Sequence, residues 1–187
     1  RPFKGQRCMN NSELPTDILE KARRITLLVL DVDGVLSDGK LYYANSGEEF
    51  KAFSTLDGLG IKLLQNAGIE VAIITGRQSA IVSRRAQELG IEKLYQGNDD
   101  KLTLLQKILE ESGKSFQETA YIGDDLPDLA CIRRVEFSAT VPNAHPLIHE
   151  YALCCTKRAG GDGAVREICD LILRAQDKFD QAIQPYL

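Results

Sequence analysis

Two aspartates separated by one residue directly follow a short apolar run, in the segment LLVLDVDGVLSDG at residues 27–39. In an extended backbone, side chains two residues apart leave the same side of the chain, so the carboxylates of Asp31 and Asp33 would lie close together. Bringing two carboxylates to about 4 Å costs ~4 kcal/mol at an effective dielectric constant of about 20. The spacing therefore predicts a compensating cation at this point.

Three further apolar runs also lead into polar residues. The second is followed by TGR at residues 75–77, the third leads through QGNDDK to Lys101, and the fourth ends in GDDLPD, which contains Asp124, Asp125 and Asp128. Because ligands gather at the carboxyl ends of the strands in an open parallel sheet, we expect these four ends to converge on one cleft. Such a mixture of charges is unfavourable in a core and suited to binding an ion.

The chemistry that this set supports is phosphoryl transfer. Carboxylates without thiolate or imidazole favour Mg²⁺, which takes one or two protein carboxylates together with water and substrate phosphate. A remaining aspartate can attack phosphorus, and a carboxyl group two residues on can protonate the leaving oxygen and then, as a carboxylate, activate water. Lys101, Arg77 and the hydroxyl of Thr75 would hold the phosphoryl oxygens in the transition state.

Each of these signals has a simpler interpretation when it is taken alone. The DxDG segment would serve as a loop or a calcium-binding turn. The EF-hand pattern fails, however, because no Glu stands at its twelfth position. Thr75 would cap a strand end, Lys101 would be a solvated lysine in the first turn of a helix, and GDD would be a turn with Asp as helix N-cap. Their joint occurrence, in this order at four strand ends, favours the chemical interpretation.

The elements that position these residues alternate along the whole chain, which is typical of an α/β fold with a parallel sheet covered on both faces. The predicted strands are residues 26–30, 70–74, 93–95, 120–122, 135–139 and 151–154. The predicted helices are residues 14–24, 58–66, 80–89, 101–111, 126–133 and 165–184.

One segment interrupts this alternation. GKLYYANSGEEFKAF, at residues 39–53, predicts two strands around an Asn-Ser-Gly turn, which is a β-hairpin inserted just after the aspartate pair. It carries Tyr42, Tyr43, Phe50 and Phe53. Two interpretations stay open, a solvated decoration and a contact with another subunit.

Length, composition and charge limit the classes of protein to which this chain can belong. The chain has 187 residues, 43% of them hydrophobic, a formal net charge of −4 and a pI near 5.3. This length and composition suit one domain with a substantial core, and no basic cluster points to nucleic acid as a partner. Apolar runs are of strand length and no segment resembles a secretory signal, so we expect a cytoplasmic protein without a membrane partner.

Two smaller features concern the cysteines and the N-terminus. Five cysteines without metal-binding spacing predict buried, reduced thiols rather than a disulfide framework or a zinc site. The only methionine is Met9, and the preceding residues show no periodicity. We therefore expect residues 1–8 to be an added or upstream remnant and residues 9–187 to form a single domain.

The motifs resemble those of a known superfamily. DVDGVLSDG, IITGR, the lysine of NDDK and GDDLPD are similar, in order, to the four motifs of the haloacid dehalogenase superfamily of phosphatases. GEEFKAFSTLDGLGIK, YQGNDDK and AGGDGAVREICDLIL further resemble the 3-deoxy-D-manno-octulosonate 8-phosphate (KDO 8-phosphate) phosphatases, from about Leu14 almost to the C-terminus. The resemblance implies a three-layer Rossmann-like parallel sheet with a β-hairpin insertion.

The resemblance also implies roles for the acidic residues. Asp31 would be the nucleophile and a Mg²⁺ ligand, and Asp33 the general acid and base, which also lends its backbone carbonyl to the metal. Asp124 would complete the protein ligands. Asp125 and Asp128 would support these ligands without binding the metal themselves.

For phosphate and substrate, the resemblance points to a larger set. Thr75 and Lys101 resemble the phosphate-binding residues of the family. Positions where the family contacts its substrate correspond here to Asp33, Ser54, Thr55, Leu56, Asp57, Gly58, Lys62, Arg77, Arg85 and Lys101. The chain departs from the family pattern at Leu56 and at Asp162, where members often carry Arg.

The cleft also has to be closed. The segment from Asp38 to Glu70 is filled by the hairpin and one helix, so no independent cap domain fits. The resemblance implies a homotetramer in which the hairpin and the glycine-rich segment at residues 158–167 reach a neighbouring cleft. The alternative for that segment is a simple loop leading into the last helix.

The expected function is Mg²⁺-dependent hydrolysis of KDO 8-phosphate on the way to lipopolysaccharide, through an aspartyl-phosphate. One alternative is a phosphatase for a sialic-acid-like nonulosonate 9-phosphate, which would share the catalytic residues. Another is a non-catalytic oligomerisation module, against which the intact carboxylates, threonine and lysine argue. A phosphomutase is disfavoured because mutases exclude water, usually with a cap.

Overall fold

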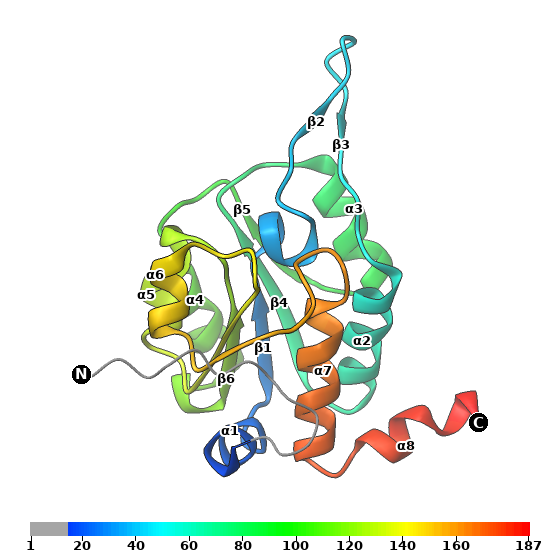
Figure 1. The fold of residues 1–187 in the computed structure, drawn as a ribbon, viewed down its shortest axis with the longest axis vertical. Helices are drawn as coiled ribbons and strands as arrows, with labels where there is room; N and C mark the ends of the chain where they lie inside the picture. The colour runs from blue at the N-terminus through cyan, green and yellow to red at the C-terminus, as the bar shows by residue number, and fades with distance from the viewer. Residues whose placement is uncertain (1–14) are drawn as a thin grey trace.

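The computed structural model describes residues 15–187. Residues 1–14 lie outside the described residues. They include the predicted remnant at residues 1–8, Met9 and Leu14. The framework is a six-stranded parallel sheet in the order β5-β4-β1-β6-β7-β8 (Figure 1). Its strands are β1 (Leu27–Leu30), β4 (Glu70–Thr75), β5 (Lys93–Gln96), β6 (Thr119–Ile122), β7 (Phe137–Thr140) and β8 (Cys154–Cys155). The strand that directly precedes the aspartate pair, β1, is therefore central, between β4 and β6.

Helices cover both faces of the sheet, as predicted. The α-helices are α1 (Thr16–Ala22), α2 (Thr55–Asn66), α3 (Ala80–Leu89), α4 (Lys101–Ser112), α5 (Leu129–Ile132), α6 (Pro146–Tyr151), α7 (Ala164–Ala175) and α8 (Phe179–Ile183). Shorter helical turns are η1 (Val32–Leu36), η2 (Phe116–Glu118), η3 (Leu126–Asp128) and η4 (Gln184–Tyr186).

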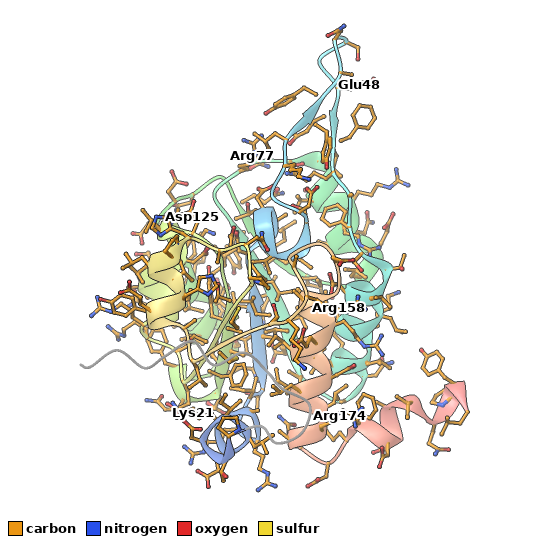
Figure 2. All side chains as sticks on the ribbon, viewed as in Figure 1. Lys21, Glu48, Arg77, Asp125, Arg158 and Arg174 are labelled. Atoms are coloured by element: carbon orange, nitrogen blue, oxygen red, sulfur yellow. The ribbon has the colours of Figure 1, made fainter. Side chains whose placement is uncertain are left out.

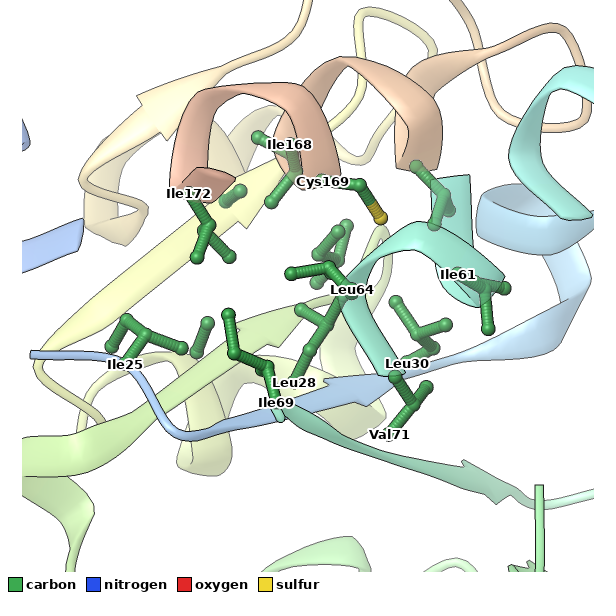
Figure 3. Close-up of a cluster of buried hydrophobic side chains, with 14 of the residues drawn as sticks. Ile25, Leu28, Leu30, Ile61, Leu64, Ile69, Val71, Ile168, Cys169 and Ile172 are labelled. Carbon is green, nitrogen blue, oxygen red and sulfur yellow. The ribbon is translucent and has the colours of Figure 1, made fainter. Parts of the chain in front are cut away.

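Alternate residues of the buried strands enter two separate hydrophobic clusters. Leu28 and Leu30 of β1 pack with α1, α2, α3 and α7, as the close-up in Figure 3 shows for part of this face. Leu27 and Val29 pack on the other side with α4, α5 and α6. A strand buried on both faces must be apolar throughout, which explains the uninterrupted LLVL run. The three-layer α/β fold is thereby confirmed.

The predicted hairpin is present and projects from the body of the molecule (Figure 1). Its strands β2 (Tyr42–Tyr43) and β3 (Glu49–Phe50) pair antiparallel, and Gly47 adopts a φ of +86° in the turn. Within residues 31–69, all of which the structure describes, the chain holds η1, this hairpin and α2, with no separate cap domain.

Two predicted elements near the C-terminus have different bounds in the structure. Residues 151–154 were expected as a strand, but Tyr151 ends helix α6 and β8 begins only at Cys154. Pro146 occupies the first turn of α6, where an amide N–H has no partner within the helix, so the missing N–H of proline costs no hydrogen bond. The ring of His145 accepts a hydrogen bond from the amide of Leu147. These two residues begin a helix that the apolar pattern alone did not reveal.

The long helix predicted for residues 165–184 is broken. Helix α7 ends at Ala175, Asp177 adopts a left-handed φ of 57°, and α8 begins at Phe179. The amide of Lys178 bonds back to the carbonyl of Leu173, which closes the end of α7. Across residues 15–187, the structure contains no helix with the length and hydrophobicity needed to cross a bilayer.

Candidate active site

Asp31 stands at the carboxyl end of the central strand. Its amide continues the ladder of β1 by donating to the carbonyl of Ile122 at 3.0 Å, and the chain then turns sharply through η1. Gly34 in this turn has a φ of +98°, and a β-carbon there would lie 2.0 Å from Oδ2 of Asp124. Only glycine allows this turn to pass so close to the carboxylate of Asp124, which follows β6, the strand paired with β1.

The loop after β6 is held by the carboxylate of Asp128. Its Oδ2 accepts hydrogen bonds from the amides of Asp124 at 3.1 Å and Asp125 at 3.3 Å. Asp125 in turn caps η3, because its own carboxylate accepts from the amide of Leu126 at 2.8 Å. Figure 2 shows Asp125 near the upper edge of the sheet, where this loop lies.

Lys101 joins the two strand ends. It is the first residue of α4, whose N-cap Asp100 accepts from the amide of Thr103. The Lys101 ammonium lies 2.7 Å from Oδ1 of Asp31 and 2.7 Å from Oδ1 of Asp128. The hydroxyl of Tyr121 also donates to Asp128, at 2.6 Å. The side chains of Asp31, Lys101 and Asp128 are at most 7% exposed, so this is a desolvated charge cluster.

The cluster is short of positive charge. Burial and the nearby Asp128 raise the pKa of Asp31 well above its usual value, although Lys101 opposes this. Burial and Asp128 also raise the pKa of Asp124 to about 7. Burial by itself would lower the pKa of Lys101, but the carboxylates of Asp31 and Asp128 outweigh it and raise that pKa. One ammonium cannot balance the buried carboxylates of Asp31 and Asp128 together with the partly buried carboxylate of Asp124, so a further cation would stabilise the ionised site.

The donor set fits Mg²⁺. Carboxylate oxygens of Asp31, Asp124 and Asp128 lie within 4.8 Å of one another. Oδ1 of Asp124 is buried and has no hydrogen-bond partner among the described residues. Both oxygens of Asp128, in contrast, already accept hydrogen bonds. Asp31 and Asp124 are therefore the side chains that would hold the ion, and Asp128 would support them.

We predict that Mg²⁺ raises the melting temperature of the protein, and by more at pH 8 than at pH 5.5. Because the folded pKa of Asp124 is about 7 against a usual 3.8, the metal-free fold loses stability as the pH rises between these values. The ion must also displace protons to bind. At about 100 times its Kd, binding adds ~2.7 kcal/mol, which corresponds to about 5–10 °C for a chain of this size.

Differential scanning fluorimetry with MgCl₂ and with chelator measures this shift. Asp124→Asn should remove the shift, whereas Asp180→Asn on α8 should keep it. A shift that is unchanged in Asp124→Asn would place the ion elsewhere.

Asp33 has a partner that the sequence analysis missed. Its Oδ1 forms an ion pair with the ammonium of Lys51, which directly follows β3. Lys51 also lies 3.6 Å from Glu49. A lysine beside two glutamates in GEEFKAF looks like an exposed hairpin residue, and no local pattern signals that it turns inward. The role of the Asp33 carbonyl toward the metal stays a prediction.

Thr75 and Arg77 follow β4 but have different surroundings. Thr75 is buried at the end of the strand next to β1, and its hydroxyl accepts from the amide of Arg77 at 3.3 Å. Arg77 lies at the base of the hairpin (Figure 2), with Nη2 3.4 Å from both the hydroxyl of Tyr43 and Oε1 of Glu49. The structure therefore places the Arg77 guanidinium against the hairpin rather than in the carboxylate cluster.

The residues predicted to contact substrate around α2 differ in their surroundings. Ser54 is the N-cap residue, and its carbonyl accepts from Arg85 at 3.4 Å. A β-carbon on Gly58 would lie 2.4 Å from Nη2 of the same arginine. Thr55, Leu56 and Lys62 are exposed on the helix. Their contacts with substrate stay predictions.

The carboxylate of Asp57 already has hydrogen-bond partners within the protein. This buried carboxylate accepts from the amide of Arg166 at 2.8 Å and from that of Gly163 at 3.4 Å, so it caps the start of α7. The glycine-rich segment before α7 packs on η1, where the amide of Gly161 donates to the carbonyl of Val35 at 2.9 Å. This segment therefore contacts the turn after Asp31 in its own subunit.

Comparisons with known proteins agree with this geometry. Residues 91–168 match a family model described as haloacid dehalogenase-like hydrolase. The 3-deoxy-D-manno-octulosonate 8-phosphate phosphatase KdsC of Escherichia coli K12 is 50% identical over 166 residues, which cover 89% of this chain and 88% of that protein.

Two solved structures are similar over nearly the whole fold. The Moraxella catarrhalis 3-deoxy-D-manno-octulosonate 8-phosphate phosphatase, in complex with magnesium, phosphate and KDO, has a TM-score of 0.90 and 48% identity, covering 91% of this chain and 98% of that one. The Yersinia pestis enzyme has a TM-score of 0.87 and 48% identity, covering 88% and 89%. This chain therefore belongs to the haloacid dehalogenase-like phosphatases, within the KDO 8-phosphate phosphatase family.

Proposed function

We propose that this protein hydrolyses KDO 8-phosphate to KDO and phosphate through an aspartyl-phosphate on Asp31, in the biosynthesis of lipopolysaccharide. The observation that carries the proposal is the cluster of buried Asp31, Lys101 and Asp128 with partly buried Asp124 at the carboxyl ends of β1 and β6. The chain is also 50% identical, over 89% of its length, to the KDO 8-phosphate phosphatase of Escherichia coli K12. A relative with the same fold binds magnesium, phosphate and KDO together.

The residues would share the reaction as follows. A carboxylate oxygen of Asp31 attacks phosphorus, the bond from phosphorus to the C8 oxygen breaks, and Asp33 donates its proton to that oxygen. Asp33, now ionised, takes a proton from a water molecule that attacks the phosphoryl group, and this step releases phosphate and restores both carboxyl groups. The Thr75 hydroxyl and the Lys101 ammonium would stabilise the charge on the phosphoryl oxygens. A bound Mg²⁺ would supply positive charge that offsets the carboxylates and the phosphate.

Asp128 and Tyr121 would act through Lys101. Each lies within 2.7 Å of its partner in this chain of hydrogen bonds, and all three side chains are buried. The ammonium is therefore fixed before substrate binds, so little reorganisation is needed during the reaction.

Phosphate release from KDO 8-phosphate, a nonulosonate 9-phosphate and 4-nitrophenyl phosphate tests the function. We expect metal-dependent hydrolysis with the highest kcat/KM for KDO 8-phosphate and loss of activity in chelator. A higher kcat/KM for the 9-phosphate would support the alternative sugar, with exposed Leu56 and Asp162 as the positions to compare. No metal-dependent release from any substrate would favour a non-catalytic oligomerisation module.

We also propose that the enzyme is a cytoplasmic homotetramer. The exposed Tyr43 and Phe50 on the projecting hairpin support burial against another subunit. The buried thiols of Cys131, Cys154 and Cys169 are compatible with a reducing compartment. The mass in solution, measured by light scattering, tests the tetramer, and a monomer at micromolar concentration would contradict it.

A further inference from the structure

Lys51 is a buried cation outside the carboxylate cluster of Asp31. Its side chain is 1% exposed, and burial of an ammonium is costly unless it is paired. Its partners are Oδ1 of Asp33 and, at 3.6 Å, Oε1 of Glu49. The two buried lysines therefore have different partners, because Lys101 pairs with the nucleophile Asp31 and Lys51 pairs with Asp33.

A chain of contacts continues from Lys51 into the hairpin. Glu49 on β3 lies 3.4 Å from Nη2 of Arg77, and the same nitrogen lies 3.4 Å from the hydroxyl of Tyr43 on β2. Arg77 is 42% exposed, so its pair with Glu49 is screened by water. The pair of Lys51 with Asp33, in which the lysine side chain is buried and the aspartate side chain is 21% exposed, is therefore the stronger connection between the hairpin and the turn that carries Asp33.

Asp33 depends on this contact for its orientation. It lies in η1 with a φ of −78° and a ψ of 107°, directly before the left-handed Gly34. Among the described residues, Lys51 supplies the hydrogen bond that its carboxylate accepts. Asp31, by comparison, is fixed by Lys101, which Asp128 and Tyr121 hold in turn.

Resting on the proposed function, we propose that Lys51 is a positioning residue that holds the carboxyl group of Asp33 toward the leaving oxygen. Through it, the base of the hairpin sets the geometry of the proton transfer. General acid catalysis depends on placing the donor within hydrogen-bond reach of the oxygen that receives the proton. Loss of the contact would therefore impair the steps that need Asp33 and spare the attack by Asp31.

The test compares substrates that differ in their need for an acid. In Lys51→Met, we expect kcat for KDO 8-phosphate, whose leaving group is an alkoxide, to fall about 100-fold with KM changed by less than about 3-fold. With 4-nitrophenyl phosphate, whose leaving group departs without protonation, the burst of nitrophenolate should keep its wild-type rate while the steady state slows. Lys51→Arg should recover part of the loss, because it keeps a cation in place.

A double-mutant cycle separates positioning from a direct role. If Lys51 acts through Asp33, adding Lys51→Met to Asp33→Asn should cause no further loss of turnover. The control is Lys93→Met, which removes another paired lysine, one that pairs with Glu70 at the amino ends of β5 and β4 and should leave turnover unchanged.

Three results would overturn the proposal: additive losses in the cycle, a burst slowed as much as the steady state, and a raised KM with unchanged kcat, which would make Lys51 a substrate ligand. If Lys51→Met does not fold, judged by thermal unfolding, the same measurements on Lys51→Arg decide. A wild-type protein that hydrolyses 4-nitrophenyl phosphate but not KDO 8-phosphate would contradict the proposed substrate, and the burst and the cycle would still test Lys51.

Discussion

Asp31→Asn is expected to abolish metal-dependent phosphate release, with a loss of about 10⁴-fold or more, while the protein stays folded. The amide cannot form the covalent intermediate, so no residual route through residue 31 remains. The fold should tolerate the change because the pKa of Asp31 is raised by burial and by Asp128, which means that its negative charge is unfavourable in the metal-free protein. The side-chain oxygen that accepts from Lys101 is also kept.

Phosphate release and thermal unfolding, measured on the same preparation, check this result. Asp180→Asn is a matched control, because Asp180 is exposed on α8, far along the chain from the site. Near-normal turnover in Asp31→Asn would remove the nucleophile from the mechanism.

Lys101→Met is expected to lower kcat by about 100- to 1,000-fold and to destabilise the metal-free protein by ~3–5 kcal/mol. The first effect follows from the loss of a preorganised charge at the transferring phosphoryl group. The second follows because Asp31 and Asp128, each 2.7 Å from the ammonium, would be left as buried carboxylates without their cation. Mg²⁺ should restore part of the stability but not the activity, since it cannot occupy the position of the ammonium.

Lys107→Met tests the same substitution on the same helix. Lys107 pairs with Glu111 at 3.8 Å and its side chain is 58% exposed, so we expect little change in stability or turnover. Urea unfolding in chelator gives the stability difference. Wild-type stability and turnover in Lys101→Met would contradict the account of the cluster.

Much of the fold could be predicted because its signals are local. The fully buried β1 requires an apolar run, and the helical period of α3 gave its bounds, residues 80–89, without error. The start of α6 was missed because it depends on Pro146 at the first turn and on the ring of His145. The break after α7 depends on one residue, Asp177, in a conformation that sequence patterns rarely reveal.

The site was predictable to the extent that it follows from topology. Parallel strands bring Asp31 and Asp124 to one edge of the sheet, and Lys101 at the start of α4 reaches both β1 and the loop after β6. Two placements were not predictable from spacing. Lys51 turns inward from a hairpin that is otherwise exposed, and Asp57 caps α7, more than 100 residues away in sequence.

Trapping of the covalent intermediate is the most direct test of the central claim, that Asp31 carries the phosphoryl group. The enzyme would be quenched in acid during turnover of KDO 8-phosphate and reduced with borohydride, which converts an aspartyl-phosphate to homoserine. Peptide mass spectrometry would then locate the modified residue. We predict homoserine at position 31, dependent on Mg²⁺ and absent from the chelator control. No modified residue, or modification at Asp33 or Asp124 instead, would contradict the mechanism.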